Sequence, residues 1–254
     1  MAIPFGLTTN DYSQMSTAAV YLQNVRFSYK QGHPILRIEK LRIPTGNSSF
    51  LHGPSGSGKT TLLSLISGVL KPQQGTVRIL GQDLTRLSAS ARDTLRGSQI
   101  GYIFQGFNLI PYLSVEENIA LPCDLHPARR ARITAPTLAG EVGRLARRLD
   151  IHTQLNAPVT HLSIGQQQRV AIARAIIGSP ALIIADEPTS ALDTDRREAF
   201  LALLIEVTSE VKVRDGIRTT LLFVSHDRSL AAGFDTLLSL AEINGETRPA
   251  KAAE

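Results

Sequence analysis

The segment Gly53-Pro54-Ser55-Gly56-Ser57-Gly58-Lys59-Thr60 constrains this chain most, because it matches G-x-x-x-x-G-K-[ST] at every fixed position. A short apolar-leaning run, residues 48–52, precedes it, and a helix-forming run, residues 61–69, follows it. In that context the glycines let backbone N–H groups turn inward, where they form an anion nest together with the helix N-terminus. The sequence therefore predicts a phosphate-binding loop. A flexible Gly/Ser linker is the alternative, but a linker would not join a strand to a helix.

A pair of carboxylates supplies the second half of the predicted site. Residues 182–185 are all apolar, as expected of a buried parallel strand, and Asp186 and Glu187 follow directly. In a phosphate-binding fold, Lys59 is expected to contact the β- and γ-phosphates, and Thr60 and Asp186 to hold Mg²⁺. Glu187 is then the candidate general base for the attacking water. An acidic pair at a helix N-cap looks similar, but the loop upstream favours the catalytic interpretation.

The apolar pattern along the chain predicts a parallel α/β core that a helical insertion interrupts, with antiparallel strands in front. The runs of strand character are residues 21–29, 35–43, 48–52, 75–80, 100–104, 182–185 and 219–225. The runs of helical character are residues 61–69, 89–96, 115–120, 138–149, 166–177 and 195–209.

Composition narrows the function classes only slightly. Cys123 is the single cysteine, which excludes an intrachain disulfide and a cysteine-based zinc site. Residues 1–14 lack the features of a secretory signal, and no stretch approaches the roughly 20 apolar residues of a membrane span. We therefore expect another protein to supply the spanning part if the chain works at a membrane. The net charge of +5 is compatible with nucleic acid, nucleotide phosphates or an anionic membrane surface, and does not choose among them.

The run Leu162-Ser163-Ile164-Gly165-Gln166, with the helical residues that follow, resembles the signature motif of the ABC (ATP-binding cassette) family. Gln105 resembles the Q-loop glutamine, Ser190-Ala191-Leu192-Asp193 the D-loop, and His226 the switch histidine. Tyr29 stands where the family places an aromatic residue that stacks on adenine. The order and spacing of the motifs match over roughly residues 20–243.

The resemblance implies an α/β fold: a P-loop (RecA-like) ATPase core with an N-terminal antiparallel β subdomain and a helical insertion subdomain at about residues 106–177. We expect a loose arm over residues 1–18, the ATPase domain over 19–243 and a loose tail over 244–254.

The resemblance also implies an ATP-hydrolysing motor that dimerises around two ATP molecules, with ATP and Mg²⁺ as cofactors. Glu187 and His226 are the expected catalytic residues. Tyr29, the whole loop from Gly53 to Thr60, Thr61 and Gln105 are expected to bind ATP, while Thr60, Gln105 and Asp186 hold Mg²⁺. Ser163, Gly165 and Gln166 are expected to act on the ATP of the partner subunit, and Asp193 at the dimer contact.

Ile164 departs from the family pattern, which usually has glycine at this position. A β-branched residue resists a positive φ and limits close approach of the backbone. Either the site in trans closes less tightly, or the backbone there does not need glycine.

Residues 105–111 and 116–122 resemble the macrolide-exporter and lipoprotein-release branch of the family. That resemblance implies a separate transmembrane permease, a peripheral location on the cytoplasmic face of the inner (plasma) membrane, and export or extracytoplasmic release. Importers share parts of the pattern and remain an alternative. A nucleic-acid-linked ABC ATPase would usually carry a coiled coil, a zinc module or a second cassette, so no nucleic-acid partner is expected. A regulatory cassette with poor hydrolysis has only Ile164 in its favour.

An apolar cluster follows Gln105 and includes Phe107, Leu109, Ile110, Tyr112 and Leu113. We expect it to form a groove for a short helix of the membrane subunit. The alternative is that these side chains pack on the helical insertion.

Overall fold

The computed structural model describes residues 17–29, 34–190, 192–213 and 216–245. Most of the expected arm and tail, and Ala191 of the D-loop motif, lie outside the described residues. Residues next to both expected domain boundaries take part in the described fold. Ala18 begins the first strand, and Asn244 is buried, where it accepts a hydrogen bond from Arg37 N at 2.8 Å and donates to Ile35 O at 3.0 Å.

The described elements are strands, α-helices and short 3-10 helices. The strands are β1 (Ala18–Phe27), β2 (Leu36–Pro44), β3 (Ser48–His52), β4 (Gln74–Ile79), β5 (Gln82–Asp83), β6 (Ile100–Ile103), β7 (Leu182–Asp186), β8 (Thr220–Ser225) and β9 (Thr236–Ser239). The α-helices are α2 (Lys59–Ile66), α3 (Ala89–Gln99), α4 (Val115–Leu125), α5 (Pro127–Arg130), α6 (Leu138–Arg148), α7 (Ile164–Ile176), α8 (Thr194–Glu210) and α9 (Leu240–Ile243). Three short 3-10 helices are η1 (His152–Gln154), η2 (Val159–His161) and η4 (Arg228–Ala231).

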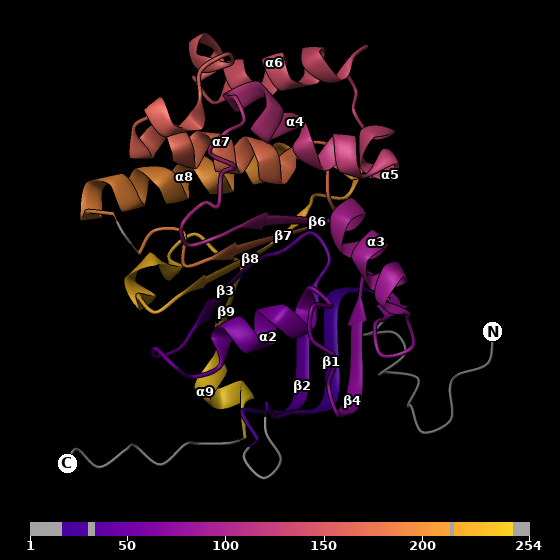
Figure 1. The fold of residues 1–254 in the computed structure, drawn as a ribbon. Helices are drawn as coiled ribbons and strands as arrows, with labels where there is room; N and C mark the ends of the chain where they lie inside the picture. The colour runs from indigo at the N-terminus through magenta and orange to yellow at the C-terminus, as the bar shows by residue number, and fades with distance from the viewer. Residues whose placement is uncertain (1–16, 30–33, 191, 214–215, 246–254) are drawn as a thin grey trace.

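The parallel sheet has the strand order β6-β7-β8-β3-β9. Because all its neighbouring strands run in the same direction, their carboxyl ends meet at one edge, where ligands bind in α/β folds of this kind. The loops after β3, β6, β7 and β8 therefore begin at the same edge of the sheet (Figure 1). The sequence pattern did not predict β9, since its four residues make too short a run to stand out.

The antiparallel sheet has the order β2-β1-β4-β5 and confirms the expected front strands. The inner residues of its strands, such as Leu22 and Val77, pack with Leu62 and Ile66 of α2 in one core. Helix α2 therefore lies between the two sheets, as Figure 1 shows.

The parallel strands are apolar throughout because they are covered on both faces. Along β7, Ile183 and Ala185 belong to the core under the helices α4, α6, α7 and α8, whereas Leu182 and Ile184 belong to the core that includes α2. Successive side chains of a strand point to opposite faces. Because both faces of this sheet are buried, the sequence of such a strand is a continuous apolar run. The α/β fold class predicted from such runs is confirmed.

Helices α4 to α7 fill the chain between β6 and β7 and lie above the parallel sheet in Figure 1. A buried arginine, Arg129, joins this layer to the sheet by donating hydrogen bonds to Ile177 O at 2.8 Å, Ile100 O at 2.9 Å and Ala175 O at 2.5 Å. Burial lowers the pKa of Arg129 to about 10. The bonds to Ile177 O and Ala175 O satisfy carbonyls at the end of α7, so Arg129 caps that end of the helix.

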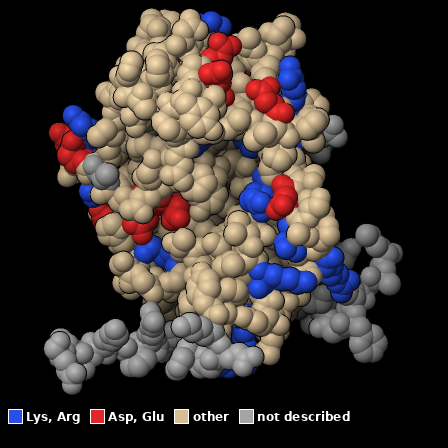
Figure 2. All heavy atoms as spheres, in the orientation of Figure 1, with Lys and Arg blue, Asp and Glu red and all other residues tan. Residues whose placement is uncertain are grey.

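The charges are unevenly spread over the face drawn in Figure 2. Lys and Arg predominate toward the lower right of this view, while acidic and basic side chains are interspersed elsewhere. No helix in the described part of the chain is both long enough and apolar enough to cross a bilayer.

Candidate active site

The phosphate-binding loop leaves the end of β3 and closes on the first turn of α2. Gly56 and Gly58 have φ of 74° and 101°, in the left-handed region that favours glycine, and Gly58 caps α2. Ser57 N donates to Pro54 O at 3.2 Å within the loop. The glycines of the motif thus give the backbone the curl that an anion nest requires.

Lys59 is buried and points back across this loop. Its Nζ donates to Gly53 O at 2.8 Å and to Pro54 O at 3.0 Å, and lies 3.1 Å from Glu187 Oε1. The ammonium group therefore connects the phosphate loop to the loop after β7.

Glu187 lies between two partners on different loops. Its Oε1 contacts Lys59, and its Oε2 lies 3.0 Å from Nδ1 of His226, which follows β8. The Glu187 backbone has φ of 45° and its N–H donates to Val224 O at 2.9 Å, which turns the side chain away from the direction of β7. Burial raises the pKa of Glu187, but the hydrogen bonds from His226 and Lys59 outweigh it and hold the pKa below its ordinary value. The carboxylate is therefore ionised at neutral pH.

Asp186 is the last residue of β7 and is half-buried. Burial raises its pKa, and the neighbouring negative charge of Glu187 adds to the rise. Its Oδ2 accepts a hydrogen bond from the hydroxyl of Tyr102 at 3.4 Å. Sequence reasoning placed Tyr102 in a strand and gave its side chain no role.

Gln105 is exposed in the turn that follows β6. In the same turn Phe107 and Asn108 have φ of 58° and 46°. The buried side chain of Arg174, from α7, donates to both carbonyls, with an Nη1 to Asn108 O distance of 2.8 Å. Arg174 also went unnoticed in the sequence, because an arginine in a helix gives no sign of which turn it supports.

Tyr29 is 61% exposed at the end of the segment after β1. Its hydroxyl lies 3.3 Å from Thr61 Oγ1, and its ring meets Phe27 edge to face with centroids 5.1 Å apart. The structure thus brings Tyr29 and Thr61, two of the predicted ATP-binding residues, together beside the phosphate loop.

The signature residues form the N-terminus of α7. Ser163 is the N-cap, with its Oγ accepting from Gln166 N at 3.3 Å and its N–H donating to Gln166 Oε1 at 2.9 Å. Ile164 is the first helical residue and is 48% exposed, so its backbone is right-handed and does not need glycine. Of the two consequences weighed for Ile164, the geometry favours the unstrained backbone.

Asp193 begins α8 as its N-cap, accepting from Arg196 N at 3.0 Å. Ser190, at the other end of the same motif, donates its N–H to Glu187 O at 3.2 Å. The D-loop motif therefore begins at Ser190, which is hydrogen-bonded to the backbone of Glu187, and ends at Asp193, the N-cap of α8.

The residues expected to hold Mg²⁺ offer a carboxylate, a hydroxyl and an amide oxygen, from Asp186, Thr60 and Gln105. Hard oxygen donors of this kind suit Mg²⁺, which is commonly held by one or two protein ligands together with phosphates and water. No cluster of three or more His, Cys, Asp or Glu side chains in the described residues forms a metal cage. The donor set fits a cation that arrives with the nucleotide.

The apolar cluster after Gln105 divides into two parts. Phe107 is buried in the core, and Leu109 packs against the same core, as the packing alternative expected. Tyr112 is 83% exposed and remains available for a partner. The loop between them is fixed by the buried Asn118, whose Nδ2 donates to Ile110 O at 3.1 Å and Leu113 O at 3.2 Å.

Comparison with known proteins agrees with this geometry. The family model described as ABC transporter matches residues 36–190. A lipoprotein-releasing system ATP-binding protein LolD of Anaeromyxobacter dehalogenans is 40% identical over 231 residues, covering 90% of this chain and 92% of its own length. A macrolide export ATP-binding/permease protein MacB of Syntrophobacter fumaroxidans is 37% identical over 215 residues, covering 84% of this chain and 29% of its own length.

The similarity also reaches an importer. A methionine import ATP-binding protein of Bacillus cereus is 36% identical over 214 residues, covering 83% of this chain and 58% of its own length. Among solved structures, the ATP-binding cassette MJ0796 in a dimeric post-hydrolysis state with ADP and Pi superposes with a TM-score of 0.72 and 34% identity, covering 87% of this chain and 93% of its own. The chain therefore belongs to the ABC transporter family, as one of its ATP-hydrolysing nucleotide-binding subunits.

Proposed function

We propose that this chain is the motor subunit of an export or lipoprotein-release type of ABC transporter, which drives a separate membrane permease by closing as a homodimer around two ATP molecules. The observation that carries the proposal is the continuous contact Lys59–Glu187–His226 at the carboxyl edge of the parallel sheet. It connects the phosphate loop, the candidate base and the loop after β8, so a γ-phosphate bound there can be sensed and attacked.

In this proposal the nucleotide is held by the phosphate loop, with Lys59 at the β- and γ-phosphates and Tyr29 stacked on adenine. Thr60, Gln105 and Asp186 would hold a Mg²⁺ ion that arrives with ATP, and the ion would neutralise phosphate charge. Glu187 accepts the proton of the attacking water, and His226 keeps the carboxylate in place. Both loops start from strands of one sheet, which supports their acting as a unit.

The homodimer is supported by the exposed N-terminus of α7. Ser163 and Ile164 are exposed, and a helix N-terminus with a serine hydroxyl suits a phosphate. In a dimer, Ser163, Gly165 and Gln166 of one copy would close over the ATP held by the other, with Asp193 at the contact. The dimeric state of the related cassette MJ0796 supports this arrangement.

The separate permease and the position on the cytoplasmic face of the membrane are supported by the lipoprotein-releasing relative, which this chain covers almost completely. The similarity to a methionine importer keeps import as the second candidate. The membrane protein that co-purifies with the chain distinguishes the two. A permease with a large extracytoplasmic domain would support release or export, and a permease that works with a substrate-binding protein would support import.

The test of the nucleotide site is Lys59→Ala. We expect the substitution to lower nucleotide affinity or ATPase turnover at least tenfold, because it removes the positive charge at the β- and γ-phosphates. Lys71→Ala, at an exposed lysine beyond α2, is the matched control. Unchanged titration of a fluorescent ATP analogue and unchanged turnover in Lys59→Ala would overturn the proposed site.

A further inference from the structure

Tyr102 lies where β6 meets β7, and its side chain runs along the sheet toward the end of β7. In the parallel register Tyr102 pairs with Ile184, two residues before Asp186. Because side chains two residues apart in a strand point to the same face, Asp186 follows Ile184 on the side that Tyr102 occupies. The hydroxyl of Tyr102 reaches Asp186 Oδ2 at 3.4 Å.

The ring of Tyr102 is itself held in place. It stacks on Phe104 with centroids 4.3 Å apart and an interplanar angle of 29°. Phe104 is the residue before Gln105, so one aromatic pair connects Asp186 to the start of the turn that carries Gln105. Asp186 and Gln105 are two of the three residues proposed to hold Mg²⁺.

The hydroxyl of Tyr102 donates to Asp186 where that side chain is half-buried and adjoins the charged Glu187. A hydroxyl that donates to one carboxylate oxygen fixes the orientation of the group and leaves the other oxygen for a cation. Groups that orient a metal ligand in this way commonly set metal affinity.

We propose that Tyr102 is a positioning residue for the Mg²⁺ carboxylate: its hydroxyl orients Asp186, and its stacking on Phe104 keeps Asp186 in register with Gln105. The inference rests on the proposed ATP–Mg²⁺ site and names a residue that acts through Asp186. The substitution Tyr102→Phe would keep the stacking and lose the hydrogen bond that orients Asp186.

The experiment compares Tyr102→Phe with the parent chain in two titrations. The first measures the affinity of a fluorescent ATP analogue in EDTA and again in excess Mg²⁺. The second measures the Mg²⁺ concentration that half-activates ATP hydrolysis. We expect that concentration to rise about threefold to tenfold, less than the roughly 10- to 100-fold typical when a group that orients a metal ligand is lost, because a 3.4 Å hydrogen bond is long. Affinity in EDTA and the melting temperature should not change.

Tyr21→Phe is the matched control, since it removes a buried tyrosine hydroxyl from the antiparallel sheet. The inference is overturned if Tyr102→Phe needs no more Mg²⁺ than the control, or if it weakens binding equally in EDTA, which would indicate a purely structural role. Asp186→Asn separates this failure from failure of the proposed function. If Asp186→Asn loses the Mg²⁺-dependent gain in nucleotide affinity and Tyr102→Phe does not, only the positioning role of Tyr102 is wrong. If Asp186→Asn keeps this gain in affinity, both the proposed metal site and the positioning role are wrong.

Discussion

Glu187 and His226 are joined by a 3.0 Å contact between Oε2 and Nδ1, although they follow different strands and are 39 residues apart in the sequence. The contact exists because β7 and β8 are neighbours in the parallel sheet and both end at the same edge. It leaves the carboxylate ionised, with its pKa held below the ordinary range by His226 and Lys59 against the opposing effect of burial. The deprotonated carboxylate is the form that a general base requires.

Glu187→Gln should therefore abolish turnover and keep ATP binding. The amide has nearly the same shape but cannot accept the proton, and loss of a general base costs about 10²–10⁴ in rate. We expect the variant to accumulate as an ATP-bound dimer in size-exclusion chromatography. Glu198→Gln, on the exposed side of α8, is the control. Hydrolysis near the parent rate in Glu187→Gln would remove Glu187 from the role of base.

Ile164→Gly should leave ATPase activity level or lower it. Ile164 is the first residue of α7 with right-handed backbone, so glycine relieves no strain there and adds flexibility at the helix end. Turnover and dimer stability with ATP are the measurements, and Ile164→Ala separates the loss of the side chain from the added flexibility. A rise of about tenfold or more in turnover, well beyond a helix-propensity effect, would contradict this expectation.

Arg129→Met should destabilise the fold strongly. The substitution leaves buried carbonyls at the end of α7 and in β6 without their donor, at about 1–3 kcal/mol for each unsatisfied group. We expect unfolding free energy to fall by at least about 3 kcal/mol, which corresponds to about 6–12 °C in melting temperature for a domain of this size.

The matched control for that experiment is Arg130→Met, the next residue along. Arg130 is exposed, and its side chain pairs with the exposed Asp124 at 3.3 Å. Its loss should change stability by about 0.5 kcal/mol or less. Equal melting temperatures for the two variants would show that the buried hydrogen bonds of Arg129 contribute little.

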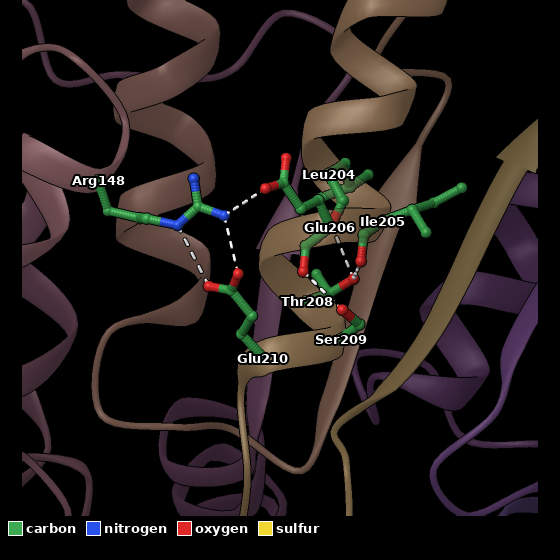
Figure 3. A network of polar contacts seen from close by, with 7 residues as sticks. All are labelled: Arg148, Leu204, Ile205, Glu206, Thr208, Ser209 and Glu210. Carbon is green, nitrogen blue, oxygen red and sulfur yellow. Dashed lines mark hydrogen bonds and ion pairs between the residues drawn. The ribbon is translucent and has the colours of Figure 1, made fainter.

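Arg148 joins the helical layer to α8 through both Glu206 and Glu210 (Figure 3). Its Nη2 lies 2.6 Å from Glu206 Oε1 and 2.8 Å from Glu210 Oε1. The hydrogen bond from Arg148 lowers the pKa of Glu210. A lowered carboxylate pKa adds stability above the unfolded-state pKa, and this stability is lost as the pH falls through the folded-state pKa.

We therefore expect Arg148→Gln to lower the unfolding free energy by about 0.5–1 kcal/mol at neutral pH and low salt, because exposed ion pairs contribute little. The difference should shrink in high salt and again at a pH below the ordinary range of glutamate. Arg147→Gln, at the exposed neighbour, makes the same change in net charge. Urea unfolding at two salt concentrations would measure the unfolding free energy of both variants. Equal values for the two variants would show that the ion pairs of Arg148 with Glu206 and Glu210 do not contribute to stability.

The parts of the site that sequence predicted are those set by a strand and the few residues after it. The phosphate loop, Asp186, Glu187 and His226 each follow an apolar run, so local pattern and motif order were sufficient to locate them. Tyr102, Asn118, Arg129 and Arg174 were missed because their roles depend on contacts with chain segments elsewhere in the fold. Arg174, for instance, bonds carbonyls 66 and 67 residues away in the sequence. Such partners are set by packing of helices on the sheet, which periodicity does not specify.

The same reasoning refines the prediction about the permease. Of the apolar residues after Gln105, Phe107 belongs to the core, and Leu113 is half-buried with its carbonyl bonded by Asn118 at 3.2 Å. A charge at either position would disturb the fold as well as any docking. Tyr112 is the clean probe because it is exposed, and apolar anchors of this kind carry much of the binding energy when a helix enters a groove.

Tyr112→Asp should therefore disrupt complex formation with the permease while the free subunit keeps its melting temperature and its ATP affinity. Val69→Asp is the matched control, since Val69 is also exposed and apolar but lies after α2, outside the turn that follows Gln105. Pull-down by the tagged permease, beside thermal melting of each free variant, gives the result. A complex that forms as well with Tyr112→Asp as with Val69→Asp would place the docking surface elsewhere. A lowered melting temperature in Tyr112→Asp alone would mean that Tyr112 supports the fold of the loop. Loss of the complex with an intact subunit is the outcome that links this turn to the membrane partner, because Gln105 at its start would carry ATP-driven closure to the permease.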